Sequence, residues 1–281
     1  MRRFVPAVAL LVALAAAGGA WHLVSKPTAL VQPAAAPAAA APSQPASPAA
    51  GKRPAPASRD VPARYRGQII RKRIRHFPDR LLALTFDDGP DPRITPLVLK
   101  ALAQYDAHAT FFVLGKCARR WPTLVKQEAA AGHAVASHSY SHPSRTSPAQ
   151  ACNELDRTSA LIEQAIGLRP QLFRPPYGIT NGNLCQTALK RGYTAVLWTI
   201  STADSNPIGP EVIAHNAIHT PNPGDIVLMH DGAGHMASAR ALPQILRELS
   251  ATGFRFVTMP ELLQAWQRWQ AGQQAPVHAQ P

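Results

Sequence analysis

Two adjacent carboxylates, Asp87 and Asp88, end an apolar run and directly precede Gly89-Pro90. Neighbouring side chains of a regular strand point to opposite faces, so both acids can serve one site only if the strand breaks there. The Gly-Pro pair supplies such a break. The competing interpretation is a plain turn, because aspartates are common in turns.

Two histidines, His138 and His142, stand four positions apart in His-Ser-Tyr-Ser-His. In a helical turn this spacing would put both imidazoles on one face, where they could bind one metal ion. Ser139 occupies the position of the general base in His-Glu-x-x-His metalloproteases, which argues against a peptidase of that class. With one added carboxylate, the pair would leave metal positions open for water and substrate. A surface pair without a metal is the alternative.

Further polar residues follow apolar segments along the chain, namely Arg174, Asp204 and His230. In parallel α/β folds the carboxyl ends of the strands meet at one edge, where ligands and catalytic groups gather. Each residue also has a plain interpretation, such as a strand-end arginine at the surface or a turn cap at Asp204. We therefore predict that these side chains converge on one edge.

The elements that would position these side chains alternate along residues 81–270. About seven strand-helix units predict parallel strands with helices packed outside, in a barrel or an open α/β sheet. The expected strands are Leu81–Phe86, Thr110–Leu114, Ala134–Ser137, Leu172–Arg174, Ala195–Ile200, Ile226–His230 and Phe254–Thr258. The expected helices cover 94–104, 121–131, 148–166, 182–191, 209–219, 239–251 and 260–270. Prolines should lie near helix starts, where a missing N–H costs least; these are Pro96, Pro122, Pro148, Pro210, Pro243 and Pro260.

Four motifs occur in a characteristic order. They are Thr-Phe-Asp-Asp-Gly-Pro at 85–90, His-Ser-x-x-His at 138–142, Arg-Pro-Pro-Tyr-Gly at 174–178 and Leu-Met-His at 228–230. Over about residues 80–268 this succession resembles the polysaccharide deacetylase family (NodB homology domain, carbohydrate esterase family 4). The resemblance implies an α/β fold, a distorted (β/α)7-type barrel. It also implies metal-dependent removal of N-acetyl groups from N-acetylglucosamine polymers such as peptidoglycan or chitin-like glycans, or less often of O-acetyl groups from xylan.

The resemblance assigns the metal ligands and the general base residue by residue. The implied ligands are Asp88, His138 and His142, with Zn²⁺ as the expected ion and Co²⁺ or another divalent ion as alternatives. Asp87 is the implied base, paired with Arg174. These roles agree with the chemistry, because a metal polarises an amide carbonyl and acidifies water, and a separate carboxylate takes the remaining proton. A guanidinium beside Asp87 should favour its ionised form.

The remaining implied roles concern the leaving group and the substrate. His230 would be the general acid that protonates the departing amine. Asp204 would hold the tautomer of His230 and raise its pKa. The residues implied to contact substrate or oxyanion are Pro176, the backbone N–H of Tyr177, and Leu228 in the acetyl-methyl pocket.

One motif departs from the family pattern. The family usually has Asp-x-x-Asp-Trp after its fifth strand, and alignment on Trp198 places Ser201 at the first Asp and Ser205 at the Trp, while Asp204 is kept. Either another aromatic residue fills the pocket or the substrate differs. Two alternatives therefore stay open, an O-acetyl esterase on the same fold and a non-catalytic envelope glycan-binding protein. Four other histidines receive no role: His133, His215, His219 and His235.

The positive charge of this chain is concentrated at its N-terminal end. The formal net charge is +13; residues 1–80 hold 13 Lys/Arg and 2 Asp/Glu, and residues 81–281 hold 16 and 14. A nucleic-acid-binding domain would carry its charge on the folded body, so we expect no nucleic acid partner. The expected partner is an acetylated glycan, bound by a monomer.

Residues 1–26 are predicted to be a cleaved signal peptide or an uncleaved membrane anchor. Arg2-Arg3 precede an uncharged apolar run that ends in small residues, as in export signals. The run is slightly shorter than the roughly 20 residues that span a bilayer, but residues 4–24 could serve as an anchor. An ordinary buried helix is the third interpretation. Either export interpretation places the protein in the periplasm or cell envelope or outside the cell, with an anchor lying in the inner membrane.

The other segments are assigned from composition. Residues 27–63 are an Ala/Pro-rich segment that should be disordered, and residues 271–281 a disordered tail. Residues 64–79 form a basic lead-in that is solvated or touches anionic lipid or envelope polymer. Residues 80–270 form the deacetylase domain. The three cysteines lack the close spacing of a zinc site and are expected to be free and buried; they are Cys117, Cys152 and Cys185.

Overall fold

The computed structural model describes residues 60–274. The predicted signal or anchor, residues 27–59 of the expected linker and residues 275–281 of the expected tail lie outside the described residues. The described parts of those two segments are folded rather than disordered, because Val61 is buried and a helix continues to Gln274. Within 60–274, no helix combines the length and the apolar character that crossing a membrane requires. The three cysteines are free, as expected, although only Cys185 is fully buried.

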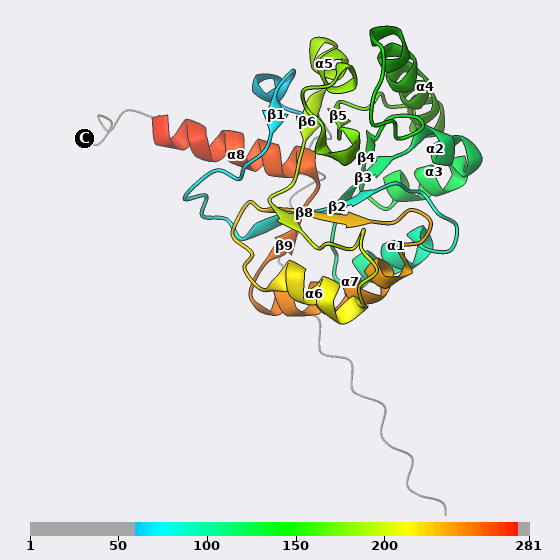
Figure 1. Cartoon of the computed structure of the whole chain (residues 1–281). Helices are drawn as coiled ribbons and strands as arrows, with labels where there is room; N and C mark the ends of the chain where they lie inside the picture. Colours follow the sequence, from blue (N-terminus) through cyan, green and yellow to red (C-terminus); the bar gives the residue numbers. More distant parts are fainter. Residues whose placement is uncertain (1–59, 275–281) are drawn as a thin grey trace, which may run out of the picture. The chain divides into compact units, whose positions relative to one another are not determined.

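A nine-stranded parallel sheet forms the centre of the described residues (Figure 1). Its strand order is β1-β6-β5-β4-β3-β2-β8-β7, with β9 paired to β2. This path has two ends, β1 and β7, so the sheet is not a closed barrel. It curls into a half-barrel, and the predicted α/β class is confirmed in this form. The strands are β1 (Ile69–Ile70), β2 (Leu81–Asp87), β3 (Ala109–Val113), β4 (Ala134–Ser137), β5 (Leu172–Phe173), β6 (Thr194–Val196), β7 (Ile200–Ser201), β8 (Ile226–His230) and β9 (Arg255–Phe256).

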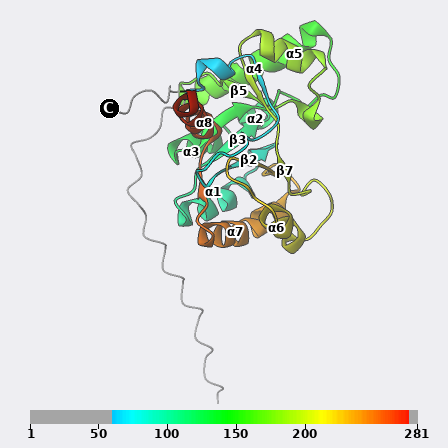
Figure 2. The same cartoon turned by 90° about the vertical axis from the view of Figure 1, so that its left-hand side faces the viewer.

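Helices interleave with the strands and surround the curled sheet (Figures 1 and 2). In Figure 1, α1, α6 and α7 lie together below the sheet, and α2 to α5 lie above it and to the right. The α-helices are α1 (Thr95–Gln104), α2 (Gly115–Arg120), α3 (Pro122–Ala130), α4 (Pro148–Ile166), α5 (Asn183–Lys190), α6 (Pro210–Ile218), α7 (Met236–Ala251) and α8 (Met259–Gln274). Two short 3-10 helices are Ala63–Tyr65 and Pro176–Gly178.

Alternating side chains of β2 separate two apolar cores, as the period of two in a strand requires. Leu82 and Leu84 pack in the outer core with residues of α1, α6 and α7. Leu81 and Ala83 pack in the inner core, where α8 contributes Trp266 and its neighbours. The inner face, continued along the strands, leads to the site described below.

Four expectations about the elements are corrected. The expected strand 195–200 is divided, because Leu197 N–H donates to Ile70 beside β6, whereas Thr199 N–H donates to Ile226 beside β7. The chain thus changes neighbours and links the two ends of the sheet covalently. Pro243 lies inside α7 rather than near its start. Helix α2 was not expected, and the basic lead-in 64–79 contributes strand β1.

Candidate active site

Four of the predicted site residues stand two positions after a residue of the inner face, so strand alternation turns them toward one mouth of the half-barrel. These pairs are Thr85–Asp87, Ala136–His138, Leu172–Arg174 and Leu228–His230. Asp87 and His230 are register partners on neighbouring strands. The predicted convergence on the carboxyl edge is found.

A sharp turn after β2 brings both aspartates to the same place. Asp88 has a φ of 71°, in the left-handed region, which ends the alternation of the strand. As a result, Nε2 of His138 lies 3.7 Å from Oδ2 of Asp87 and 3.7 Å from Oδ1 of Asp88. Gly89 has no space for a side chain, because a Cβ there would lie 2.3 Å from Oδ1 of Asp231. The expected strand break is confirmed.

Three ligand atoms, one each from Asp88, His138 and His142, lie within 4.8 Å of one another. Nε2 of His142 is 3.7 Å from Oδ1 of Asp88. The predicted helical turn is wrong, because residues 138–142 form a loop in which Ser139 and His142 have φ values of 67° and 65°. Left-handed backbone at non-glycine residues is costly and collects at functional sites.

The donors of this cluster fit a divalent metal. Oδ1 of Asp88 is buried and has no hydrogen-bond partner among the described residues. Nδ1 of His138 donates to the carbonyl oxygen of Arg174 at 2.7 Å, which leaves the lone pair of Nε2 directed at Asp88. Burial lowers the pKa of His138 to about 3 and also lowers the pKa of His142, so both imidazoles are neutral. Neutral imidazole nitrogens and a carboxylate are donors that Zn²⁺ prefers.

A buried arginine holds the second aspartate. Nη1 of Arg174 donates to Oδ1 of Asp87 at 2.8 Å and to Oγ1 of Thr85 at 2.8 Å. Its Nε donates to the carbonyl oxygen of Val196, and its guanidinium lies 4.2 Å from the ring centre of Phe112. Burial raises the pKa of Asp87 and the positive charge of Arg174 opposes this; the net direction is upward. The guanidinium therefore favours the ionised form of Asp87, as expected, but burial outweighs it.

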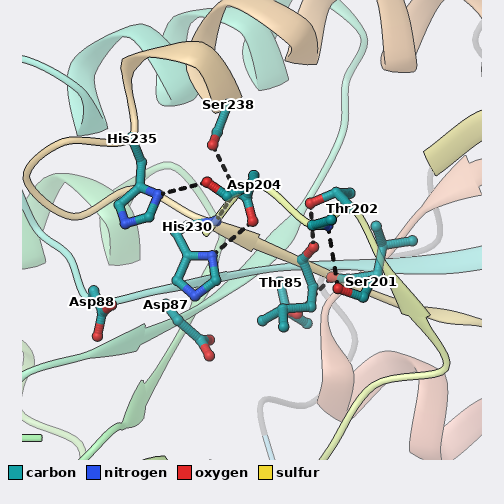
Figure 3. Close-up of polar contacts among 12 residues, drawn as sticks. Thr85, Asp87, Asp88, Ser201, Thr202, Asp204, His230, His235 and Ser238 are labelled. Carbon is teal, nitrogen blue, oxygen red and sulfur yellow. Dashed lines mark hydrogen bonds and ion pairs between the residues drawn. The ribbon is translucent and has the colours of Figure 1, made fainter. Parts of the chain in front are cut away.

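His230 is held between Asp204 and Asp87 (Figure 3). Its Nδ1 lies 2.8 Å from Oδ1 of Asp204, whose Oδ2 accepts from the backbone N–H of His230 and from Oγ of Ser238. Burial alone would lower the pKa of His230, but the hydrogen bond to Asp204 and the charges of Asp87, Asp204 and Asp88 raise it to about 9. The expected pairing of His230 with Asp204 is found.

The residues expected to contact substrate also line this mouth. Tyr177 has a φ of 57° and a side chain that is 64% exposed, with its ring centre 4.5 Å from that of His142. Pro176, the preceding residue, is buried. Leu228 is buried in β8, one step inward from His230 along the same face.

Two serines depart from the family pattern and lie at the surface. Ser201 ends β7 and Ser205 follows in the next turn, and both are exposed. An aromatic ring is nevertheless present at the mouth. Trp198 stands two positions after the inner-face residue Val196, and the guanidinium of Arg174 lies 5.8 Å from its ring centre.

Two supporting residues had no role assigned from the sequence, although Asp231 stands with His230 at the end of an expected strand. Glu154 of α4 accepts the backbone N–H groups of Tyr140 and Ser141 at 2.8 Å each and so holds the histidine loop. Burial raises the pKa of Asp231, which packs against Gly89, to about 7. A glutamate inside an amphipathic helix carries no local signal of such a role, whereas Asp231 directly follows a motif and its place at the strand end was visible.

Comparison with known proteins agrees with this geometry. The family profile described as polysaccharide deacetylase matches residues 75–196. A peptidoglycan-N-acetylglucosamine deacetylase of Bacillus cereus is 41% identical over 191 residues, which cover 66% of this chain and 89% of that protein.

Solved structures are similar as well. A crystal structure of a peptidoglycan N-acetylglucosamine deacetylase superimposes with a TM-score of 0.66 at 32% identity and covers 72% of this chain and 94% of that one. A pseudoenzyme of the same family from Bacillus anthracis gives a TM-score of 0.62 at 27% identity and covers 67% and 66%. Because it has the motifs of the family, the fold of a solved member and 41% identity over 191 residues with the B. cereus protein, this chain belongs to the polysaccharide deacetylase family.

Proposed function

We propose that this protein is a metal-dependent hydrolase that removes the acetyl group from N-acetylglucosamine units of peptidoglycan and releases acetate. The observation that carries the proposal is the convergence of Asp88, His138 and His142 within 4.8 Å, with Asp87 beside His138 and with His230 paired to Asp87 on the neighbouring strand. The B. cereus relative gives the substrate class. The finer choice between peptidoglycan and chitin-like glycans rests on that likeness alone.

Asp87 serves as the general base in this proposal. Arg174 occupies Oδ1 of Asp87 and leaves Oδ2 directed toward the histidine cluster. A base pKa that burial has raised above the ordinary value is better suited to accept a proton near neutral pH. Asp88 remains free of Arg174 and is therefore available as a ligand.

His230 serves as the general acid. Asp204 fixes the tautomer through Nδ1, so Nε2 carries the proton that is delivered to the departing amine. A pKa of about 9 keeps the imidazole protonated at neutral pH. The base and the acid are thus separate groups carried by neighbouring strands.

Asp88, His138 and His142 would hold the cation, and we propose Zn²⁺ because two neutral imidazoles and one carboxylate suit it. When bound, the cation supplies Lewis-acid polarisation of the acetyl carbonyl and makes water a better nucleophile. We also propose that the protein acts outside the cytoplasm, as a secreted or inner-membrane-anchored enzyme. The sequence of residues 1–26 supports this location.

One observation keeps a second candidate in view. Ser201 and Ser205 replace residues that the family usually has, and the family includes a pseudoenzyme of similar structure. A glycan-binding protein without turnover would account for these replacements. The complete set of base, acid and ligands favours hydrolysis, because binding alone has no need of all three.

The deciding experiment measures acetate release from peptidoglycan, chitin oligosaccharides and O-acetylated xylan, with mass spectrometry of the products. We expect loss of acetyl groups from N-acetylglucosamine units, abolished by a chelator and restored by Zn²⁺ or Co²⁺. Full activity after thorough metal removal contradicts the proposal. Glycan binding without any acetate release favours the second candidate, and release from xylan alone favours an esterase.

A further inference from the structure

His235 has no part in the proposed reaction, yet its ring lies against that of the proposed acid. The ring centres of His230 and His235 are 4.7 Å apart and their planes differ by 18°. Nδ1 of His235 donates to the backbone carbonyl oxygen of Asp204 at 3.3 Å. Figure 3 shows His230 between Asp204 and Asp87, with His235 beside it.

The turn that carries His235 is fixed against the end of β2. A Cβ at Gly232 would lie 2.6 Å from Cβ of Asp88 and 2.8 Å from its carbonyl oxygen, so only glycine allows this approach. Gly234 has a φ of 98°, which favours glycine again. The backbone N–H of Ser238 donates to the carbonyl oxygen of His235 at 3.1 Å as α7 begins. The position of His235 is thus built into the turn.

The spacing of Asp204, His230 and His235 would also permit a metal ion. The hydrogen bonds argue for a different use of this cluster. Oδ1 of Asp204 is engaged by Nδ1 of His230, and Oδ2 accepts from two donors, one of them Ser238. Both carboxylate oxygens of Asp204 are thus used to orient the imidazole of His230 and are not free to coordinate an ion.

We propose that His235 is a positioning residue for His230, and that its stacked ring holds the acid's ring plane and stabilises the protonated imidazole. This inference rests on the proposed function of His230. A π face attracts a cation, and parallel rings at this separation limit rotation of each other. The charged and titratable groups that face His230 are Asp87 and Asp88 at the end of β2, Asp204, His142 and the adjacent Asp231.

The test compares His235→Ala with His235→Phe in the full-length, metal-loaded protein, using pH–rate profiles. We expect His235→Ala to lower kcat about tenfold with KM nearly unchanged, because only the acid step is affected. The alkaline limb should move down by roughly 0.5 to 1 pH unit, the amount that loss of one aromatic contact predicts. His235→Phe keeps an aromatic ring at this position and should return the alkaline limb most of the way to its wild-type pH. A profile of His235→Ala that overlays the wild type, or an effect on KM alone, overturns the inference, as does a Phe variant that behaves like the Ala variant.

A second measurement separates this inference from the proposed function. NMR titration of the His230 ring needs no turnover, and His235→Ala should lower its midpoint. If His230→Gln keeps full activity, the proposed acid is wrong, whatever the titration shows. If His230→Gln is inactive but the titration of His230 is unchanged in His235→Ala, only the role of His235 fails. His219→Ala is the matched control, because the exposed His219 caps the end of α6, stacks on the exposed His215 at 4.9 Å and should change neither readout.

Discussion

Asp87 and His230 are register partners on the adjacent parallel strands β2 and β8. Neighbouring strands lie about 4.8 Å apart, so the hydrogen bonds of the sheet set the separation of the proposed base and acid. Arg174 orients the first and Asp204 the second, each through a 2.8 Å contact. The backbone pairing therefore sets the distance between Asp87 and His230. The hydrogen-bond partner of each side chain sets the direction in which that side chain points.

Asp87→Asn should separate turnover from metal binding. The amide keeps the shape of the side chain but cannot accept the proton, so kcat should fall by about 10²- to 10⁴-fold. Metal content, measured by elemental analysis, should remain close to that of the wild type. His138→Ala should lose both metal and activity, because it removes a ligand from the cluster. Equal metal loss in the two variants would show that Asp87 is itself a ligand.

The rate should depend on pH in a bell-shaped manner. Asp87 must be ionised, and because burial raises its pKa the rate should begin to fall on acidification at a higher pH than for an ordinary aspartate. His230 must be protonated, so the rate should fall as the pH rises through about 9. In profiles of kcat/KM, His230→Gln should remove the alkaline limb. An alkaline limb that persists in this variant assigns it to another group.

Arg174→Met should destabilise the fold as well as the site. The substitution leaves the buried carboxylate of Asp87 without its partner, and breaking a buried pair in this way costs about 3–5 kcal/mol of unfolding free energy. Denaturant unfolding measures this loss. The matched control is Arg191→Met, which breaks the partly exposed pair with Asp156 and should cost about 0–1 kcal/mol. Similar losses in the two variants contradict the structural argument.

Gly89→Ala should displace the turn that carries Asp88. The new methyl group would lie 2.3 Å from Oδ1 of Asp231, so backbone or carboxylate must move. We expect lower thermal stability together with weaker metal binding in a competition assay. Gly272→Ala is the control, because no atom lies within 4 Å of a Cβ there and alanine favours a helix over glycine by roughly 0.5–1 kcal/mol. A Gly89→Ala protein as stable and metal-loaded as the wild type would show that the turn yields easily.

Much of the site could be predicted from local pattern. Apolar strands that end in polar residues predicted a site at the carboxyl edge of the sheet. Strand alternation from Leu228 to His230, and from Leu172 to Arg174, brings His230 and Arg174 to that edge. The break after Asp87 was also visible, because Gly-Pro directly follows the two acids.

Other features depend on partners that are distant in sequence. The spacing of His138 and His142 fits a helix, but Glu154 accepts the N–H groups between them and holds a loop instead. The division of the strand near Trp198 follows from pairing first with Ile70 and then with Ile226. The local sequence around these segments does not reveal such distant partners. The stacking of His235 on His230 likewise depends on how close Gly232 comes to β2.

Strand β1 changes the meaning of the basic lead-in. Ile69–Ile70 pairs with β6, and Tyr65 and Phe77 are buried in the inner core on either side of it. The exposed cations of this segment are therefore displayed at set positions on the folded surface; they are Arg64, Arg66, Arg71, Lys72, Arg73 and Arg75. A polyanionic wall polymer would therefore contact positive charges held in fixed positions relative to the mouth of the half-barrel, and not charges on an unstructured segment.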